Sequence, residues 1–248
     1  MNDFNRGYPA QAPSRADMAV DAGLRAFMLG VYNKLAIGLV VAGALAYVTG
    51  NVPAVTSLLW TETATGYGIT MLGMAVQFLP LVLLFGSMFV MKNPTAGGVN
   101  LLYWAVVASI GASLGFVFLR YTGESVASTF FVTAAAFGAL SLFGYTTKKD
   151  LSGWGSFLIR GVIGLILASI VNMFLGSGML MLIISALGVL IFSGLIAYDT
   201  QRLKMTYYAL GGDQQAMGVA TGFGALGLFI NFVNLFQVLL AFMGGSRE

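Results

Sequence analysis

Seven long apolar stretches divide this chain, and short polar or charged connections separate them. An α-helix rises 1.5 Å per residue, so about 20 apolar residues cross the hydrocarbon core of a bilayer. The predicted spans cover residues 31–50, 68–90, 97–119, 126–146, 155–175, 179–198 and 217–243. The pattern therefore predicts an all-α, polytopic membrane protein with seven transmembrane helices in one domain over residues 24–248.

The composition indicates that lipid is the main solvent. Hydrophobic residues make up 58% of the chain and charged residues 8%, whereas a soluble domain carries roughly 25% charged residues. The chain has no cysteine and no histidine, so disulfides, thiolate metal sites and histidine acid–base chemistry are excluded. We expect the lipid bilayer as a partner, no nucleic acid, no stably bound cofactor and no enzyme activity.

The N-terminal residues differ from the rest of the chain. Residues 1–23 are polar and lack the apolar core of a cleavable signal peptide. We expect a flexible cytoplasmic tail that ends in a short interfacial helix at about residues 24–32.

The basic residues predict the orientation. If the seven spans alternate, every lysine and arginine except Arg120 and Arg247 falls on the side of the tail. Basic residues concentrate on the cytoplasmic side, so the N-terminus is predicted to be cytoplasmic and the C-terminus external. The alternative is six spans and a re-entrant last segment, because glycines weaken the start of the last helix; these are Gly218, Gly222, Gly224 and Gly227.

Asp199 is the strongest candidate for function. It lies near the end of an almost wholly apolar span, where a central aspartate would cost about 2.5–3.5 kcal/mol on insertion scales. Such residues usually face the bundle interior and usually act in transport or proton transfer. The structural alternative is an ion pair in the headgroup region with Arg202, three residues further along the helix.

The last span carries three amides, Asn231, Asn234 and Gln237. Their i, i+3, i+6 spacing spreads them over a face about 120° wide, with Gln237 towards its edge. Because amides cannot face acyl chains without leaving donors unpaired, we expect them to face inward and line a polar path. The alternative is hydrogen bonding between helices for packing alone.

Two further patterns have competing interpretations. Gly111 and Gly115 form a GxxxG motif, which serves either packing within the bundle or a dimer face. Tyr198-Asp199 with Gly211-Gly212-Asp213 loosely resembles the two motifs of a di-aspartyl intramembrane protease. However, Asp213 precedes two glutamines in a polar loop, and no proline follows Pro94, so the protease interpretation is weak.

From about residue 20 to the end, and most specifically in its last half, the chain resembles the Bax inhibitor-1 family, and its bacterial members in particular. Tyr198-Asp199-Thr200-Gln201, followed by residues 228–236, is similar to the family signature, and residues 137–157 also resemble bacterial members. The resemblance implies a seven-helix fold in which six helices surround the last one. It also implies a location in the bacterial inner membrane.

The resemblance implies a proton-sensitive calcium leak that two aspartates close on the cytoplasmic side. Asp199 matches the first aspartate, but the second falls on Asn231, which cannot share a proton with it. Two functions follow. The first is a cation (calcium) leak with Asp199 and Asn231 as ion or gate pair, transient Ca²⁺, and Asn234 and Gln237 lining the pore. The second is a non-conducting regulator that binds a membrane-bound AAA protease or another membrane complex.

Overall fold

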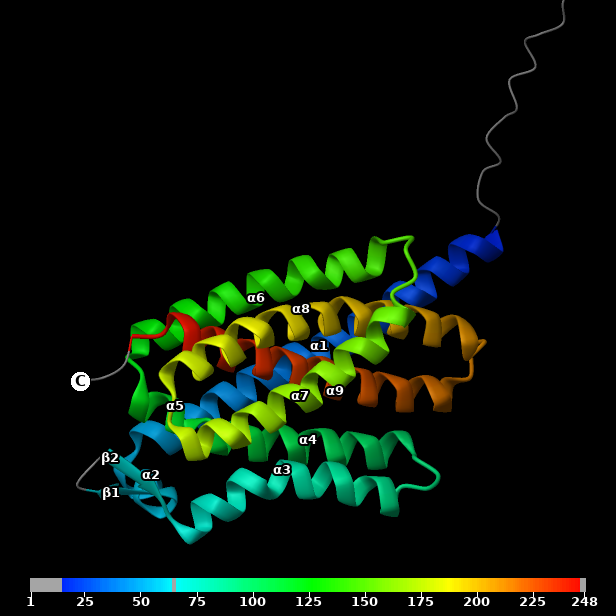
Figure 1. Ribbon diagram of the computed structural model, residues 1–248. Helices are drawn as coiled ribbons and strands as arrows, with labels where there is room; N and C mark the ends of the chain where they lie inside the picture. The colour runs from blue at the N-terminus through cyan, green and yellow to red at the C-terminus, as the bar shows by residue number, and fades with distance from the viewer. Residues whose placement is uncertain (1–14, 64–65, 246–248) are drawn as a thin grey trace, which may run out of the picture.

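The computed structural model describes residues 15–63 and 66–245, with side chains from residue 22 onward. Most of this range is helical (Figure 1), and the elements follow one another along the chain as α1 (Arg15–Asn51), α2 (Pro53–Leu59), β1 (Trp60–Thr63), β2 (Gly66–Ile69), α3 (Met71–Val90), α4 (Ala96–Ser113), α5 (Gly115–Arg120), α6 (Gly123–Thr146), α7 (Ser152–Leu175), α8 (Gly178–Ala209) and α9 (Gln214–Met243).

The predicted fold class is confirmed. Within the described residues, seven stretches are long and apolar enough to cross a bilayer. They are Ala22–Asn51, Met71–Val90, Ala96–Arg120, Gly123–Thr146, Ser152–Leu175, Gly178–Ala209 and Gln214–Met243. The last one is a continuous helix of 30 residues, which at 1.5 Å per residue exceeds a core about 30 Å thick. The re-entrant alternative is therefore wrong.

The predicted interfacial helix does not exist as a separate element. Helix α1 starts at Arg15 and continues without a break through residues 24–32 to Asn51. Leu24, Phe27, Met28 and Val31 are buried, at the i, i+3, i+4, i+7 spacing of one helix face. This segment therefore packs into the bundle instead of lying at the interface. Residues 1–14 of the predicted tail lie outside the described residues, and α1 includes the remainder of it.

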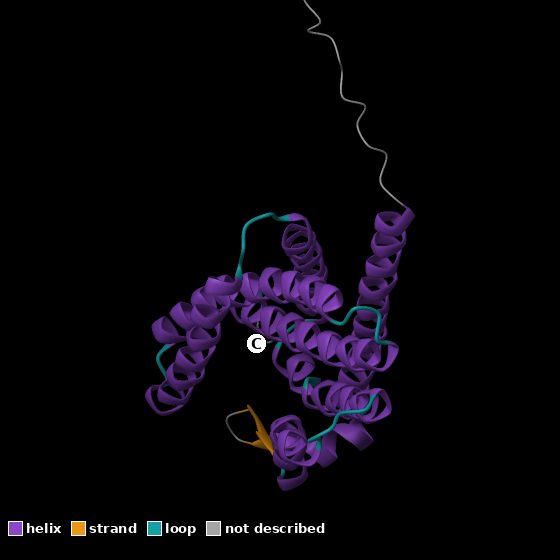
Figure 2. Ribbon diagram, turned by 90° about the vertical axis from the view of Figure 1, so that its right-hand side faces the viewer, coloured by secondary structure: helices purple, strands orange, loops and turns teal. Residues whose placement is uncertain are grey.

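The connection between the first two spans folds into α2 and a small hairpin. Strands β1 and β2 pair antiparallel from Trp60↔Ile69 to Thr63↔Gly66. Thr70 then caps α3, because its side chain accepts a hydrogen bond from the Gly73 amide at 3.0 Å. Figure 2 shows the hairpin at the edge of the helix bundle. The end of the bundle with this hairpin is called the hairpin end.

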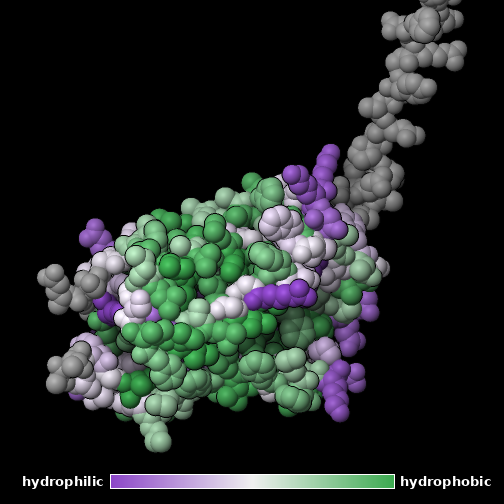
Figure 3. Space-filling view, in the orientation of Figure 1, coloured by the Kyte–Doolittle hydropathy of each residue, from purple (hydrophilic) through white to green (hydrophobic). Residues whose placement is uncertain are grey.

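The opposite end holds the α3–α4, α6–α7 and α8–α9 connections. It is called the basic end, because these connections carry Lys92, Lys148 and Lys149. The wall between the two ends is mostly apolar, and hydrophilic side chains gather near the ends (Figure 3). This distribution is that of an integral membrane protein.

Helix α9 is the centre of the bundle. It packs against α1, α4, α6 and α8, whereas α3 packs mainly on α4 and α7 packs on α8 (Figure 1). Four spans therefore flank the last helix directly, and two form an outer layer, which refines the expectation of six surrounding helices. The side chains that α9 buries are mostly large and apolar, among them Leu228, Phe229 and Leu235.

Glycines bring neighbouring helices into close contact. A Cβ at Gly111 would lie 2.7 Å from the Cα of Ala42, and one at Gly115 would collide with Thr49 on the same helix, α1. Gly144 of α6 lies equally close to the backbone of Ala197 on α8. The GxxxG motif therefore packs α4 and α5 onto α1 inside the bundle.

Candidate functional site

Asp199 and Asn231 lie in direct contact where α8 and α9 cross the middle of the bundle. The Asn231 Nδ2 donates a hydrogen bond of 2.7 Å to Asp199 Oδ2. Asn231 is buried, and the Asp199 side chain is 22% exposed. Arg202, one turn along α8, approaches Asp199 Oδ1 at 3.8 Å. Thus Asp199 has both partners that the sequence suggested, an amide on α9 and a guanidinium on α8.

The local sequence of α9 permits this approach. Gly227 lies one turn before Asn231, and a Cβ there would be 3.8 Å from Asp199 Oδ2. At Gly224, a Cβ would collide with the side chain of Leu203 on α8. Small residues at these two positions therefore let α8 and α9 come close beside the carboxylate.

A cavity opens from the Asp199–Asn231 pair towards the basic end. Its volume is about 130 Å³, and its walls come only from α8 and α9. Asp199 and Arg202 are its charged residues, Thr206 lies further along α8, and Gly224 and Gly227 face them from α9. We call it the basic-end cavity. A cation entering it would meet the Asp199 carboxylate beside the Arg202 guanidinium.

A second hollow lies on the other side of the pair. This groove of about 410 Å³ is lined by α7, α8 and α9, and it includes Asn234 and Gln237 together with Ser169. Asn234 is half-buried and Gln237 is exposed. Both amides border this hollow, but the exposed Gln237 does not face inward as expected. Most of the other side chains that line the hollow are apolar, such as Leu165 and Ile166, so it is not the polar path that the sequence predicted. We call this hollow the amide groove.

The two hollows follow one stripe of α9. Ala220, Gly224 and Gly227 face the basic-end cavity, and Asn234 and Val238 face the amide groove. These positions recur every three or four residues, and so they lie on one side of the helix. Asn231 occupies the same stripe between the two sets. The Asp199–Asn231 hydrogen bond therefore lies between the positions of the two hollows along α9.

The donor set limits which ions could stay bound. Among the described residues, no group of three or more histidine, cysteine or acidic side chains could hold a metal ion. Calcium takes six to eight oxygen ligands, and here one carboxylate faces one amide and one guanidinium. The chemistry of this site suits brief contact with a hydrated cation, not retention of a bound one.

Gly224 and Gly227 are the site residues that the sequence interpretation missed. They appeared only as weak points in the last helix. Their spacing is the signal that could have found them, because residues 220, 224, 227, 231 and 234 follow each other at i+4, i+7, i+11 and i+14. A run of small residues leading to a buried amide marks the side on which another helix comes close.

The fold and the site together define a polytopic helical membrane protein in which an acid on α8 is hydrogen-bonded to a buried amide on the central helix α9. Residues 24–248 match the family described as "Inhibitor of apoptosis-promoting Bax1". The chain belongs to this family, the Bax inhibitor-1 family, as the resemblance predicted.

Several bacterial proteins are similar over nearly their whole length. An uncharacterised protein of Caulobacter vibrioides is 67% identical, and the alignment covers 100% of both chains. The inner membrane protein YbhL of Escherichia coli K12 is 39% identical over 94% of this chain and 98% of its own length. The protein RP147 of Rickettsia prowazekii is 40% identical over 92% of this chain and 93% of its own length.

Proposed function

We propose that this protein is a cation leak of the bacterial inner membrane that passes calcium, and that the Asp199–Asn231 pair is its gate. The observation that carries the proposal is the position of the pair between the two hollows on one stripe of α9. With the hydrogen bond made, the hollows are separate. If α8 and α9 part at this point, the basic-end cavity and the amide groove join.

The charges around Asp199 give the gate a way to open. Arg202 lies on the basic-end side of the carboxylate at 3.8 Å, and its own side chain is 66% exposed. An exposed pair of this kind is worth at most about 1 kcal/mol, so an arriving cation can replace the guanidinium. Once a cation neutralises Asp199, its carboxylate no longer needs the Asn231 donor, and the two helices lose their polar link.

The orientation and location belong to the same proposal. The basic end is cytoplasmic, because it collects the basic residues of the connections. The similarity to an E. coli protein named as an inner membrane protein supports the inner membrane as its location. The basic-end cavity would then face the cytoplasm, and the amide groove would lie on the external side of the pair.

Calcium uptake by liposomes containing the purified protein tests this function. Wild-type protein should take up Ca²⁺ faster than protein-free liposomes, and Asp199→Asn should remove the difference. The matched control is Glu124→Gln, which neutralises an exposed acid in the first turn of α6 and should leave uptake unchanged. Equal uptake by wild type and Asp199→Asn would refute the gate.

The second candidate is a non-conducting regulator that binds a membrane-bound AAA protease or another membrane complex. The observation that favours it is the amide of Asn231 beside Asp199, because it stands where the proton-sensitive leak implied by the family resemblance would need a second acid. Two results together would establish this function instead. The wild type would conduct no better than empty liposomes, and it would change substrate cleavage by a co-reconstituted AAA protease.

A further inference from the structure

A cleft runs along the bundle between α1 and α6. Both helices pack against α9, and two hollows lie between them. The hollow near the basic end has a volume of about 780 Å³ and lies between Arg25, Tyr32, Ser141 and Tyr145. The hollow near the hairpin end has a volume of about 340 Å³. Together they are called the α1–α6 cleft.

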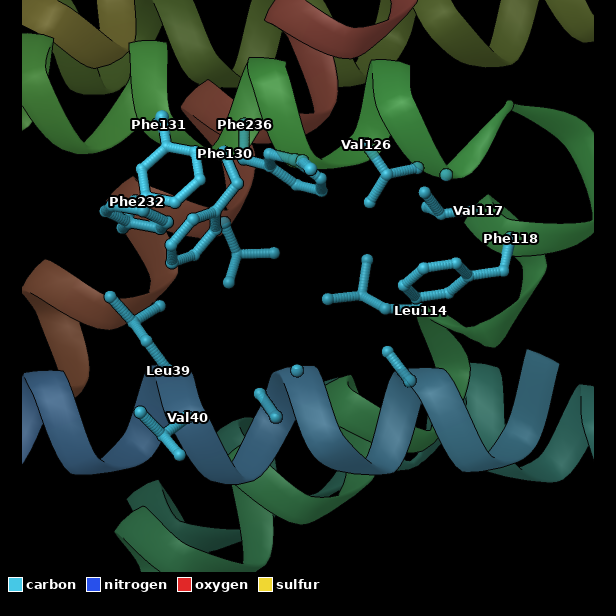
Figure 4. Close-up of a pocket in the computed structure, with 16 residues that line it drawn as sticks. Leu39, Val40, Leu114, Val117, Phe118, Val126, Phe130, Phe131, Phe232 and Phe236 are labelled. Atoms are coloured by element: carbon cyan, nitrogen blue, oxygen red, sulfur yellow. The ribbon is translucent and has the colours of Figure 1, made fainter. Parts of the chain in front are cut away.

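The hollow near the hairpin end suits hydrocarbon. Figure 4 shows Leu39 of α1 pointing across it towards Phe130 of α6. Side chains of α9 form the floor, where the ring of Phe232 lies 5.6 Å from that of Phe130. All the side chains that line this hollow are apolar; they are completed by residues such as Leu114, Val117, Val126 and Phe236.

The mouth at the basic end is chemically different. Arg25 is exposed there on α1, and Tyr145 faces it from α6. The Lys204 Nζ lies 3.2 Å from the carbonyl oxygen of Tyr145 and 5.2 Å from the centre of its ring. Lys148 and Lys149 follow Tyr145 within four residues. The cleft is thus apolar along its length and basic at one end.

The hydroxyl of Ser141 is an independent sign of an occupant. Ser141 is only 6% exposed and lines the basic-end hollow. Its Oγ has no hydrogen-bond partner anywhere in the part of the chain that the structure describes. Because a buried hydroxyl without a partner is costly, an acceptor from outside this chain would complete the site.

Glycines keep the cleft open without serving helix contact. A Cβ at Gly43, Gly123 or Gly138 would meet nothing within 4 Å, and all three line the cleft. Gly111 and Gly144 differ, because a Cβ there would strike the backbone of a neighbouring helix. The space beside the first three glycines is therefore available to another molecule.

We propose that the α1–α6 cleft binds one anionic phospholipid, with an acyl chain along the apolar hollow and the phosphate at Arg25. The cleft opens sideways to the bilayer, so its occupant comes from the lipid phase. Basic pockets between transmembrane helices select anionic headgroups, and Arg25 and Ser141 line the same basic-end hollow, so a lipid ester oxygen is the acceptor assigned to Ser141. This site is separate from the Asp199–Asn231 pair, and its test does not depend on conduction.

Native mass spectrometry of the full-length protein in detergent tests the site, with phosphatidylglycerol and phosphatidylcholine of identical acyl chains as probes. The wild type should bind one phosphatidylglycerol more tightly than phosphatidylcholine. Arg25→Gln should reduce this preference about fivefold, the effect of one basic residue near the headgroup. Gly138→Leu, which fills the cleft, should abolish binding of both lipids. Millimolar glycerol phosphate should not compete, because it lacks the chains.

The matched control is Gly164→Leu on α7, where a Cβ would also meet no atom of the described residues within 4 Å and which does not line the α1–α6 cleft. It should bind lipid as the wild type does. If Gly138→Leu does not give monodisperse protein, Gly43→Leu fills the other hollow and takes its place. Equal affinity for the two lipids, or undiminished binding after the cleft is filled, would overturn the proposal. Finding a second copy of the chain bound in the cleft, in place of lipid, would also overturn the proposal.

Discussion

Asn231 donates a 2.7 Å hydrogen bond to the carboxylate of Asp199, and this bond joins the central helix α9 to α8. An uncharged amide therefore stands where a second carboxylate would form a coupled titrating unit with Asp199. One acid and one amide have no proton to share. The contact therefore holds the helices together without giving the pair a proton switch of its own.

The first prediction follows from this chemistry. Ca²⁺ uptake by the wild type should show no steep step between about pH 5 and pH 8, because the chain lacks histidine and the pair lacks a second acid. Asn231→Asp should create such a step. Uptake should rise with pH, since loss of the shared proton places two like charges in contact and drives α8 and α9 apart. The rate of Ca²⁺ uptake is measured as a function of pH for the wild type and for Asn231→Asp, and identical pH profiles would contradict the prediction.

Arg202 is predicted to restrain the leak. Its guanidinium lies 3.8 Å from Asp199 and competes with incoming cations for the carboxylate. Arg202→Gln should therefore increase the rate of Ca²⁺ uptake on the order of twofold to fivefold, the fold-change that corresponds to the free energy of an exposed ion pair. Arg160→Gln is the control, because Arg160 is an exposed arginine on α7 that lines neither hollow. Unchanged or slower uptake in Arg202→Gln would show that the guanidinium does not hold the carboxylate.

The close helix contacts predict a difference in stability between glycines. Gly111→Leu and Gly144→Leu should each lower the free energy of unfolding by about 1–3 kcal/mol or more, because the new side chain strikes backbone that cannot yield. Gly164→Leu should cost nothing measurable, since its surroundings are open. Thermal unfolding in detergent measures all three. Equal losses at Gly111 and Gly164 would contradict the packing described for α4 and α1.

The topology prediction rests on the basic residues and on the continuous last helix. A reporter fused after residue 248 should be active on the external side, and one fused in the 147–151 connection should be active in the cytoplasm. Matching signals from both fusions would contradict seven spans, because these positions are separated by the odd number of spans α7, α8 and α9.

The sequence was most informative where lipid imposes a strict physical limit. A span must be long and apolar, so the seven spans could be placed from composition alone. A buried acid and a buried amide each need a partner, and this requirement, with the family signature, predicted that Asp199 and Asn231 belong together. The spread of the amides was also informative, because Gln237, at the edge of the predicted face, is the most exposed of the three.

Features that depend on the neighbours of a helix could not be predicted. Gly111 and Gly138 are both glycines in apolar runs, yet one presses on α1 and the other borders open space. Gly111 belongs to the GxxxG motif, but that motif did not show whether the contact lies within the bundle or at a dimer face, since the difference lies in which helix stands opposite. The α1–α6 cleft was missed for the same reason. The interfacial helix was wrongly separated from the first span because the polar residues of α1 suggested a boundary that the buried face of Leu24 and Phe27 overrides.

The absence of cysteine from the chain permits the most direct test of the gate. Gly227→Cys introduces a single thiol beside Asp199, on the wall of the basic-end cavity. The measurement is Ca²⁺ uptake before and after a charged methanethiosulfonate reagent, with Gly164→Cys on the outer face of α7 as the control. If the Asp199–Asn231 pair gates the conduction path, the reagent stops uptake through Gly227→Cys and leaves Gly164→Cys and the wild type unchanged. Undiminished uptake through fully labelled Gly227→Cys would show that cations do not pass this pair.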